Sequence, residues 1–223
     1  MSARIAVVAG AGGGVGQATV RLLHAAGLSV VAVDRSPAKL ADLPADIHRE
    51  VADVTDPTAA VPLLRHVAAQ VGAPQILINA IGMHALGDFR TVTPDGLRTL
   101  MDVNLGTALW LTQAVAPYLA RQRESVIIHI GARAGVEAAP GAAAYGASKA
   151  ALAHLGRILD LELRPQGTRV HIILPRLIAT AANKAALPSQ LLSAATTPEA
   201  VAGAIMSLVA DGPAAIQDVL VPV

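Results

Sequence analysis

Short apolar runs alternate with helical patterns along the whole chain. The runs are rich in Val, Ile and Ala, which is typical of buried β-strands. The segments between them repeat apolar residues every three or four positions, the period of an amphipathic helix. Strands are predicted at residues 4–9, 28–33, 47–52, 75–79, 125–130, 169–174 and 216–221. Helices are predicted at residues 14–26, 56–71, 94–102, 105–122, 144–164 and 198–210, with a short one opening at Ser36-Pro37.

This alternation predicts an α/β fold. Near-continuous apolar strands separated by helices indicate a parallel sheet that is covered on both faces. Right-handed crossovers then give a doubly wound Rossmann sheet, whose ligand crevice lies at the carboxyl ends of the strands. We therefore expect one Rossmann domain over residues 1–223, with a seven-stranded, mainly parallel sheet and helices on both faces. The segment 181–197 has no interpretable pattern.

Composition and charge narrow the class of protein. Apolar residues make up 53% of the chain and aromatic residues 2%, so the core is built from Ala, Val, Leu and Ile. The net charge is +1, with both signs interspersed, which argues against a nucleic-acid partner. The chain has no cysteine, which excludes disulfides and thiol catalysis. No metal site is expected. The amino end lacks a secretory pattern, so we expect a cytoplasmic protein.

One long uncharged stretch, residues 103–120, calls for a membrane test. It contains Asn104, Gln113 and Pro117, which is polar for a lipid-facing span. A buried helix that packs against a second subunit explains it better. We therefore predict no membrane insertion, and a homodimer or homotetramer in which the apolar faces of 103–120 and 144–164 are covered.

A glycine-rich loop joins the first strand to the first helix. It reads Gly10-Ala-Gly-Gly-Gly14-Val-Gly16. Glycines let the backbone turn sharply and approach a pyrophosphate, while the helix start presents N–H groups to it. The spacing differs from Gly-x-Gly-x-x-Gly, although Gly10, Gly12 and the small residue Val15 nearly fit that pattern.

Asp34 ends the second strand at the distance from this loop that a ribose ligand requires. Its carboxylate can accept both adenosine ribose hydroxyls and would repel a 2′-phosphate, which favours NAD(H) over NADP(H). Arg35 works in the opposite direction, because a guanidinium there would offset a phosphate. Asp53-Val54 follows the third strand and either frames the adenine or simply caps a helix.

Tyr145 and Lys149 are four residues apart, so on a helix they share a face one turn from each other. The reference pKa of tyrosine is about 10, which makes it a poor acid or base at neutral pH. An ammonium nearby favours the phenolate, so we expect Lys149 to lower the pKa of Tyr145. Together with the glycine-rich loop, this pair indicates proton transfer beside a nicotinamide.

The order and spacing of these motifs resemble the short-chain dehydrogenase/reductase family over essentially the whole chain. The resemblance implies that Tyr145 is the proton donor, that Lys149 binds the nicotinamide ribose, and that Asn104 holds a water that relays protons to Lys149. It is carried by Gly10 to Gly16, Asp53, Asn79-Ala-Ile-Gly82, Asn104, Tyr145-x-x-x-Lys149 and Pro175 to Thr180. The cofactor contacts expected on this basis are Gly10, Gly13, Gly14, Val15, Gly16, Asp34, Arg35, Asp53, Val54, Asn79, Ala80, Ile81, Tyr145, Lys149, Pro175, Leu177 and Thr180.

The chain departs from the family at Ala132, where a serine normally helps to hold the substrate carbonyl. Loss of such a donor typically costs about 10²–10³ in rate. The usual Pro-Gly after the sixth strand is Pro175-Arg176, and Ala9 replaces a threonine. In these departures the chain resembles the dihydropteridine reductase subgroup, which likewise lacks the serine and has a residue other than glycine after the proline. That subgroup reduces an electron-poor quinonoid dihydropterin with NADH, for which hydride and one proton from Tyr145 can suffice.

Four residues near the expected pocket are candidate substrate contacts: His84, Ala132, Arg133 and Arg176. The two arginines could bind an anionic or polar substrate. Surface or subunit contacts explain them equally well. We predict an NAD(P)H-dependent oxidoreductase that transfers hydride to an activated C=N or C=O group of its substrate. A pterin is one candidate for that substrate. One alternative is an ordinary alcohol/ketone dehydrogenase in which His84 or a water replaces the serine. Another is a catalytically retired dinucleotide-binding regulatory or structural protein, against which the intact Tyr145 argues.

Overall fold

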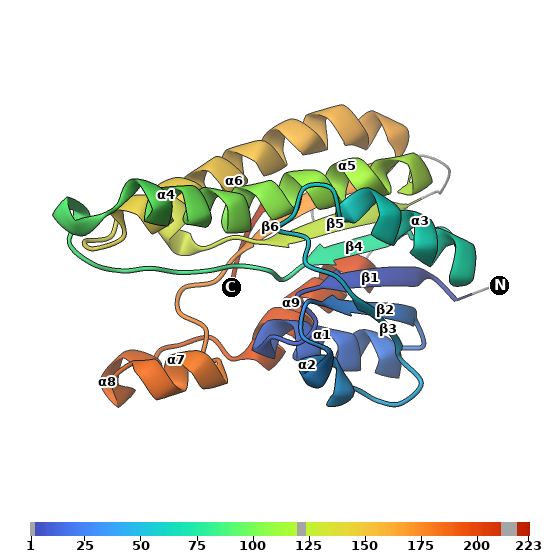
Figure 1. The fold of residues 1–223 in the computed structure, drawn as a ribbon, viewed down its shortest axis with the longest axis horizontal. Helices are drawn as coiled ribbons and strands as arrows, with labels where there is room; N and C mark the ends of the chain where they lie inside the picture. The colour runs from blue at the N-terminus through green and yellow to red at the C-terminus, as the bar shows by residue number, and fades with distance from the viewer. Residues whose placement is uncertain (1–2, 120–123, 211–217) are drawn as a thin grey trace.

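A parallel sheet in the order β3-β2-β1-β4-β5-β6-β7 forms the centre of the computed structural model, which describes residues 3–119, 124–210 and 218–223 (Figure 1). Each neighbouring pair of strands runs parallel. The predicted seven-stranded parallel sheet is therefore confirmed. The strands are β1 (Ile5–Ala9), β2 (Ser29–Asp34), β3 (His48–Val51), β4 (Ile76–Asn79), β5 (Ser125–Ile130), β6 (Thr168–Leu174) and β7 (Leu220–Pro222).

Helices cover both faces of this sheet (Figure 1). One face carries α1 (Gly14–Ala25), α2 (Pro37–Ala41) and α9 (Pro198–Ala210). The other face carries α3 (Ala60–Gln70), α5 (Thr107–Leu119) and α6 (Ala143–Leu163), and α4 (Pro94–Met101) extends this layer beyond the sheet. The short helices α7 (Ala181–Ala186) and α8 (Ser189–Leu192) lie off the carboxyl ends of the strands.

The period of two along each strand divides the core into two layers. Val8, Ile78 and Ile128 face α1 and α9, whereas their neighbours Val7, Leu77 and Ile127 face α3 and α5. All six of these side chains are 0% exposed. This two-sided burial is why the strands read as continuous apolar runs rather than as alternating ones.

The two helices predicted at 94–102 and 105–122 are not separated. A π-helical turn, Asp102–Gly106, joins α4 to α5 without a break, so the predicted gap is wrong. No proline or capping residue ends the helix there. Asn104 in the turn donates hydrogen bonds to Met83 O in the loop after β4 and to Ser148 Oγ on α6. Residues 120–122 of the prediction lie outside the described residues.

The last predicted strand, 216–221, begins later. Residues 216 and 217 lie outside the described part of the chain, and the strand spans Leu220–Pro222. The unassigned segment 181–197 folds into α7 and α8 and returns to the loop after β6. There Thr196 N donates to Leu177 O at 2.7 Å, and Ala179 N donates to Thr196 O at 2.9 Å.

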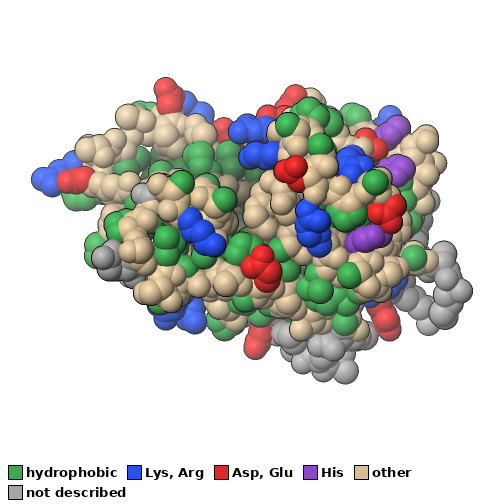
Figure 2. Space-filling model, turned by 90° about the horizontal axis from the view of Figure 1, so that it is seen from below, with side chains coloured by type: hydrophobic (Ala, Val, Ile, Leu, Met, Phe, Trp, Pro, Cys, Tyr) green, Lys and Arg blue, Asp and Glu red, His purple; other side chains and the backbone are tan. Residues whose placement is uncertain are grey.

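The surface on the side of α1, α2 and α8 carries hydrophobic side chains and charges of both signs in a mixed pattern (Figure 2). Among the described residues, no helix is long and apolar enough to cross a membrane. Nor do the described ranges contain a group of three or more His, Asp or Glu side chains that is arranged to hold a metal ion.

Candidate active site

The glycine-rich loop turns between β1 and α1 and leaves the amino end of α1 open. Gly10 has a φ of +78°, a left-handed conformation that favours glycine. A Cβ on Gly16 would lie 2.1 Å from Gly10 O, so a side chain there is excluded. Gly13 and Gly14 are exposed, and no side chain caps α1 at Gly13. The uncapped N–H groups and the absence of side chains fit the pyrophosphate of a dinucleotide.

Asp34 is held rigidly at the end of β2. Its two carboxylate oxygens accept hydrogen bonds from Gly12 N and Ser36 N, each at 2.9 Å. A Cβ on Gly12 would lie 2.9 Å from Asp34 Oδ2, so this contact also depends on glycine. A carboxylate has about four acceptor positions, and the remaining two suit the hydroxyls of a ribose.

Arg35 is directed toward Asp53, with 3.7 Å between Arg35 Nη1 and Asp53 Oδ2. Asp53 also accepts from Thr55 Oγ1 at 2.7 Å and from Thr55 N at 3.1 Å. These Thr55 hydrogen bonds, aided by Arg35, hold the pKa of Asp53 below its ordinary value. Val54 is 1% exposed and packs in the core.

The loop after β4 crosses directly over Gly10. Asn79 shapes this crossing, because Nδ2 donates to Thr107 Oγ1 and Oδ1 accepts from Ile81 N, both at 3.1 Å. A Cβ on Gly10 would lie 2.9 Å from Ile81 N and 3.0 Å from the carbonyl carbon of Ala80. Asn79, Ala80 and Ile81 therefore lie against the glycine-rich loop, where the resemblance expects them.

Asn104 joins three elements at the carboxyl edge of the sheet. It is 1% exposed, and its Oδ1 accepts from Met83 N at 3.0 Å while its Nδ2 donates to Met83 O at 2.9 Å. Nδ2 also donates to Ser148 Oγ on α6, at 2.9 Å. A Cβ on Gly82 would lie 3.5 Å from Asn104 Oδ1 and 3.3 Å from Lys149 Nζ. Asn104 and Lys149 thus border the same short stretch of loop.

Burial controls the acidity of Tyr145 and Lys149. Lys149 is 2% exposed, its Nζ donates to Ile130 O at 2.8 Å, and burial lowers its pKa to about 8. Burial raises the pKa of Tyr145 to about 12. The expected lowering of the Tyr145 pKa by Lys149 is therefore wrong for this structure, because loss of water around the phenol outweighs the ammonium one turn away. Tyr145 is protonated at neutral pH.

His129 on β5 is packed in the core close to Lys149. Its Nε2 is 3.2 Å from Thr112 Oγ1, and the ring is 0% exposed. Burial, and then the charge of Lys149, lower the pKa of His129 to about 3. The imidazole is therefore neutral at physiological pH.

His84 lies beside Tyr145, with the two ring centroids 6.4 Å apart and the rings at 75°, an edge-to-face arrangement. Ala132 is 3% exposed and adopts an extended conformation at the start of the turn Arg133–Gly135. That turn packs on α6, since a Cβ on Gly135 would lie 2.7 Å from Lys149 O. His84 therefore lies beside Tyr145, and the turn that follows Ala132 packs against α6 at Lys149.

Arg133 and Arg176 share one carboxylate. Both pair with Glu137, Arg133 through a close contact of Nη1 and Arg176 at 3.9 Å. Arg133 N also donates to Pro175 O at 2.9 Å, which ties together the loops after β5 and β6. The two arginines therefore have an intramolecular partner, in line with the surface-contact reading, and they still border the loop that contains Ala132.

Thr180 connects the loop after β6 to the glycine-rich loop. Its Oγ1 accepts from Asn183 N at 3.2 Å and so caps α7. Its Cγ2 lies 3.4 Å from the position of a Cβ on Gly14. Pro175 is buried, and Leu177 is half-buried where its carbonyl accepts from Thr196. Of these three residues, Thr180 is the one that contacts the glycine-rich loop.

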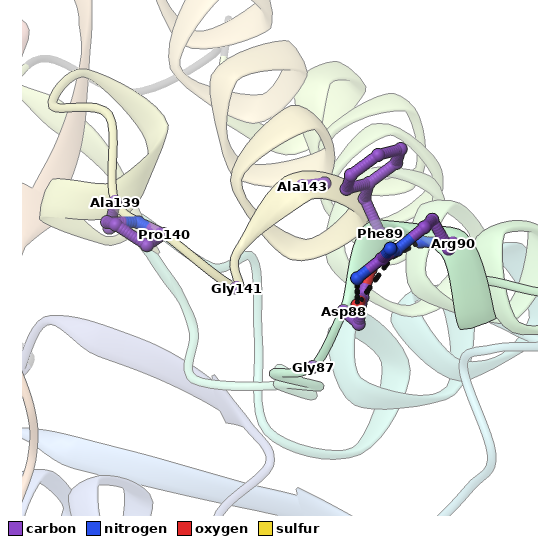
Figure 3. Close-up of a pocket in the computed structure, with 8 residues that line it drawn as sticks. All are labelled: Gly87, Asp88, Phe89, Arg90, Ala139, Pro140, Gly141 and Ala143. Atoms are coloured by element: carbon purple, nitrogen blue, oxygen red, sulfur yellow. Dashed lines mark hydrogen bonds and ion pairs between the residues drawn. The ribbon is translucent and has the colours of Figure 1, made fainter.

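A hollow of about 540 Å³ opens at the outer edge of this region (Figure 3). It lies between the loop after β4 and the loop before α6, which are joined by a hydrogen bond from Gly87 N to Gly141 O at 2.9 Å. Ala143, the first residue of α6, lines it, whereas Tyr145 and Lys149 do not. Its lining residues are Gly87, Asp88, Phe89, Arg90, Ala139, Pro140, Gly141 and Ala143.

Three residues that the sequence did not single out for a role prove to organise the site. Met83 binds Asn104 through its backbone, and no sequence signal identifies a backbone contact. Ser148 is buried, and its Oγ donates to Tyr145 O at 2.7 Å. Glu137 had a detectable signal, because it lies four residues after Arg133.

Comparison with known proteins agrees with this geometry. The sequence profile of the short chain dehydrogenase family matches residues 4–190. An uncharacterized oxidoreductase of Staphylococcus epidermidis is 30% identical over 181 residues, 79% of each chain. A short chain dehydrogenase/reductase from Burkholderia thailandensis is 31% identical, with a TM-score of 0.88 over 100% of this chain and 92% of that one. An NADPH-bound short chain oxidoreductase from Pseudomonas aeruginosa, described as having an atypical catalytic center, shares the fold at 23% identity, with a TM-score of 0.90 over 99% and 95% of the two chains.

The chain therefore belongs to the short chain dehydrogenase family and is an oxidoreductase of that family, whose members bind NAD(P). The resemblance found in the sequence is confirmed at this level. The local resemblance to dihydropteridine reductase stays a hypothesis.

Replacing Lys149 with Met should stabilise the protein at neutral pH by about 1–3 kcal/mol, because it removes a buried charge at the loss of one hydrogen bond. Burial of the Lys149 charge lowers the free energy of unfolding by a constant amount below pH 8. This destabilisation decreases between pH 8 and 10.5, where the unfolded chain still binds the proton that the folded protein has lost. The advantage of Lys149→Met should therefore shrink toward pH 10. Urea unfolding at pH 7 and pH 10 measures it.

Lys184→Met, at an exposed position, is the control for the loss of a lysine charge. If the Lys149→Met protein is less stable than the wild type at pH 7, the hydrogen bond to Ile130 O stabilises the fold by more than burial of the charge destabilises it, which contradicts this prediction.

Proposed function

We propose that this protein transfers hydride between NAD(H) and an activated C=O or C=N group of a small molecule, with Tyr145 as the proton donor. The observation that supports this is a chain of close approaches along the loop after β4. Gly10 adjoins Ile81, and Gly82 adjoins both Asn104 and Lys149. The dinucleotide loop and the acid–base group thus meet at the carboxyl edge of one sheet, where a Rossmann fold binds its ligand.

A bound nicotinamide dinucleotide would supply or accept the hydride. Tyr145 gives its proton to the oxygen or nitrogen that gains charge, and its high pKa keeps it protonated until then. The charge of Lys149, one turn away, favours the phenolate that proton transfer leaves behind. Asn104 uses both N–H groups of its amide, and its Oδ1 retains one acceptor position for a water that returns the proton.

A dihydropterin is one candidate substrate. Ala132 and Arg176 both favour it, because they replace the residues that distinguish ordinary family members from that subgroup. A simple ketone is the other candidate, and it is favoured by the contact between His84 and Tyr145, which brings a possible donor to the site. A screen of NADH oxidation with dihydropterin, quinones and small ketones separates the two.

Tyr145→Phe should lower kcat by about 10²–10⁴ on whichever substrate the screen identifies, because it removes the proton donor and leaves the ring in place. NADH affinity, measured by calorimetry, should change little. Tyr118→Phe is the matched control, since Tyr118 is the other tyrosine of the chain and lies on α5. A Tyr145→Phe protein as active as the wild type on every substrate would reject the assignment and favour the retired, regulatory alternative.

We expect NADH to bind at least about tenfold more tightly than NADPH, a difference of about 1.4 kcal/mol, because the carboxylate of Asp34 repels a 2′-phosphate. Arg35 is held toward Asp53 and only weakly offsets this repulsion. Asp53→Asn should loosen Arg35 and improve NADPH binding more than NADH binding. Calorimetry with both cofactors tests this, and equal affinities for the wild-type protein would mean that Arg35 governs the pocket.

We also propose a homodimer or homotetramer that pairs through α5 and α6. On the outer side of α6, Leu161 is 77% exposed and Ile158 is 39% exposed. Light scattering at micromolar concentration should report a multiple of 22.6 kDa. Leu161→Arg should shift the protein toward the monomer, whereas Leu86→Arg, at an exposed leucine in the loop after β4, should not. A wild-type particle of 22.6 kDa would reject the pairing.

A further inference from the structure

The side chain of Ala132 offers the substrate no hydrogen bond. Its methyl group cannot donate, and the backbone N–H groups on both sides of it are already used. Gly131 N donates to Ile173 O at 2.8 Å, and Arg133 N donates to Pro175 O at 2.9 Å. Because the turn is also packed against α6, these groups cannot reorient without breaking the contact between the loops after β5 and β6.

Ser148, the nearest hydroxyl on the catalytic helix, does not replace the missing donor. It is 0% exposed, donates its proton to Tyr145 O at 2.7 Å, and accepts from Asn104 Nδ2 at 2.9 Å. A hydroxyl has one proton to donate, and that proton is engaged within α6. Neither the Ser148 hydroxyl nor the Ala132 side chain therefore replaces the missing donor.

The loop after β4 supplies such a group in a fixed place. Asn104 binds both the N–H and the carbonyl of Met83, which fixes the backbone immediately before His84. Two hydrogen bonds to one residue restrict that residue to a single orientation. His84 follows directly, so its Cα is positioned by the same amide that helps to organise the catalytic helix through Ser148.

The His84 side chain reaches Tyr145. The ring centroids are 6.4 Å apart at 75°, so the imidazole meets the phenol edge to face. Within the described part of the chain, neither a ring nitrogen of His84 nor the Tyr145 hydroxyl has a hydrogen-bond partner. Both polar groups are thus free to bind one and the same external atom. A neutral imidazole carries one N–H donor, so this role requires no change of its charge.

From this geometry we infer that His84 is a further catalytic residue, which donates a hydrogen bond to the substrate oxygen or nitrogen that receives the proton of Tyr145. It takes over the role that Ala132 cannot fill. In the reduction, hydride brings two electrons to the carbon of the C=O or C=N bond, and Tyr145 supplies the proton. His84 stabilises the developing negative charge and keeps its own proton. This inference rests on the proposed function.

His84→Phe tests it, because phenylalanine keeps the ring contact with Tyr145 and removes the donor. With the substrate found in the screen, kcat/KM should fall about 10²–10³-fold, mainly through kcat. His84→Asn retains a donor and should lose less. Adding Ala132→Ser to the His84→Phe protein should restore activity at least about tenfold, because it returns a donor to the site.

His48→Phe on β3, at the far edge of the sheet, is the matched control and should behave as the wild type. NADH affinity and thermal unfolding should be unchanged in every variant. His84→Phe activity within about threefold of the wild type, where Tyr145→Phe is inactive, would overturn the role of His84 and leave the proposed function intact. A fall that Ala132→Ser does not reverse would overturn it too. If Tyr145→Phe is also fully active, or no substrate is found, the proposed function itself fails.

Discussion

The amide of Asn104 is the contact on which the organisation of the site depends. It lies in a π-helical turn between α4 and α5, and it binds the backbone of Met83 on one side and Ser148 on the other. A π turn inserts a residue and redirects one side chain without ending the helix. One buried side chain thereby connects the loop after β4, the helix pair and α6, so that the position of His84 and that of the Tyr145 helix are set together.

Burial makes this site electrostatically costly to fold. A lysine that is 2% exposed beside a neutral, buried histidine lowers the stability of the folded state at neutral pH, and a buried phenol resists ionisation. The same dry surroundings strengthen every hydrogen bond and charge that acts on a substrate. The apolar layer that contains Leu77 and Ile127 supplies stability that offsets the buried charge of Lys149.

The conformation of the glycine-rich loop depends on glycines at positions where a side chain would not fit. Gly12 and Gly16 lie where a Cβ would meet Asp34 and the backbone of Gly10, respectively. The backbone can therefore close on itself and orient the carboxylate of Asp34 before any ligand binds. A rigid carboxylate discriminates between ligands better than a mobile one, because it cannot move away from an added phosphate.

The sequence predicted the seven parallel strands, the glycine-rich loop and the placement of Tyr145 and Lys149 one turn apart on a helix, because these depend on local periodicity and spacing. It did not determine the continuous helix through Asn104, the contact of His84 with Tyr145 or the shared carboxylate of Glu137, because these join residues of different elements. The sequence also did not predict the direction in which the pKa of Tyr145 is shifted. Spacing reveals which charge is near, whereas only the packed tertiary structure decides how much water remains, and here the loss of water prevails.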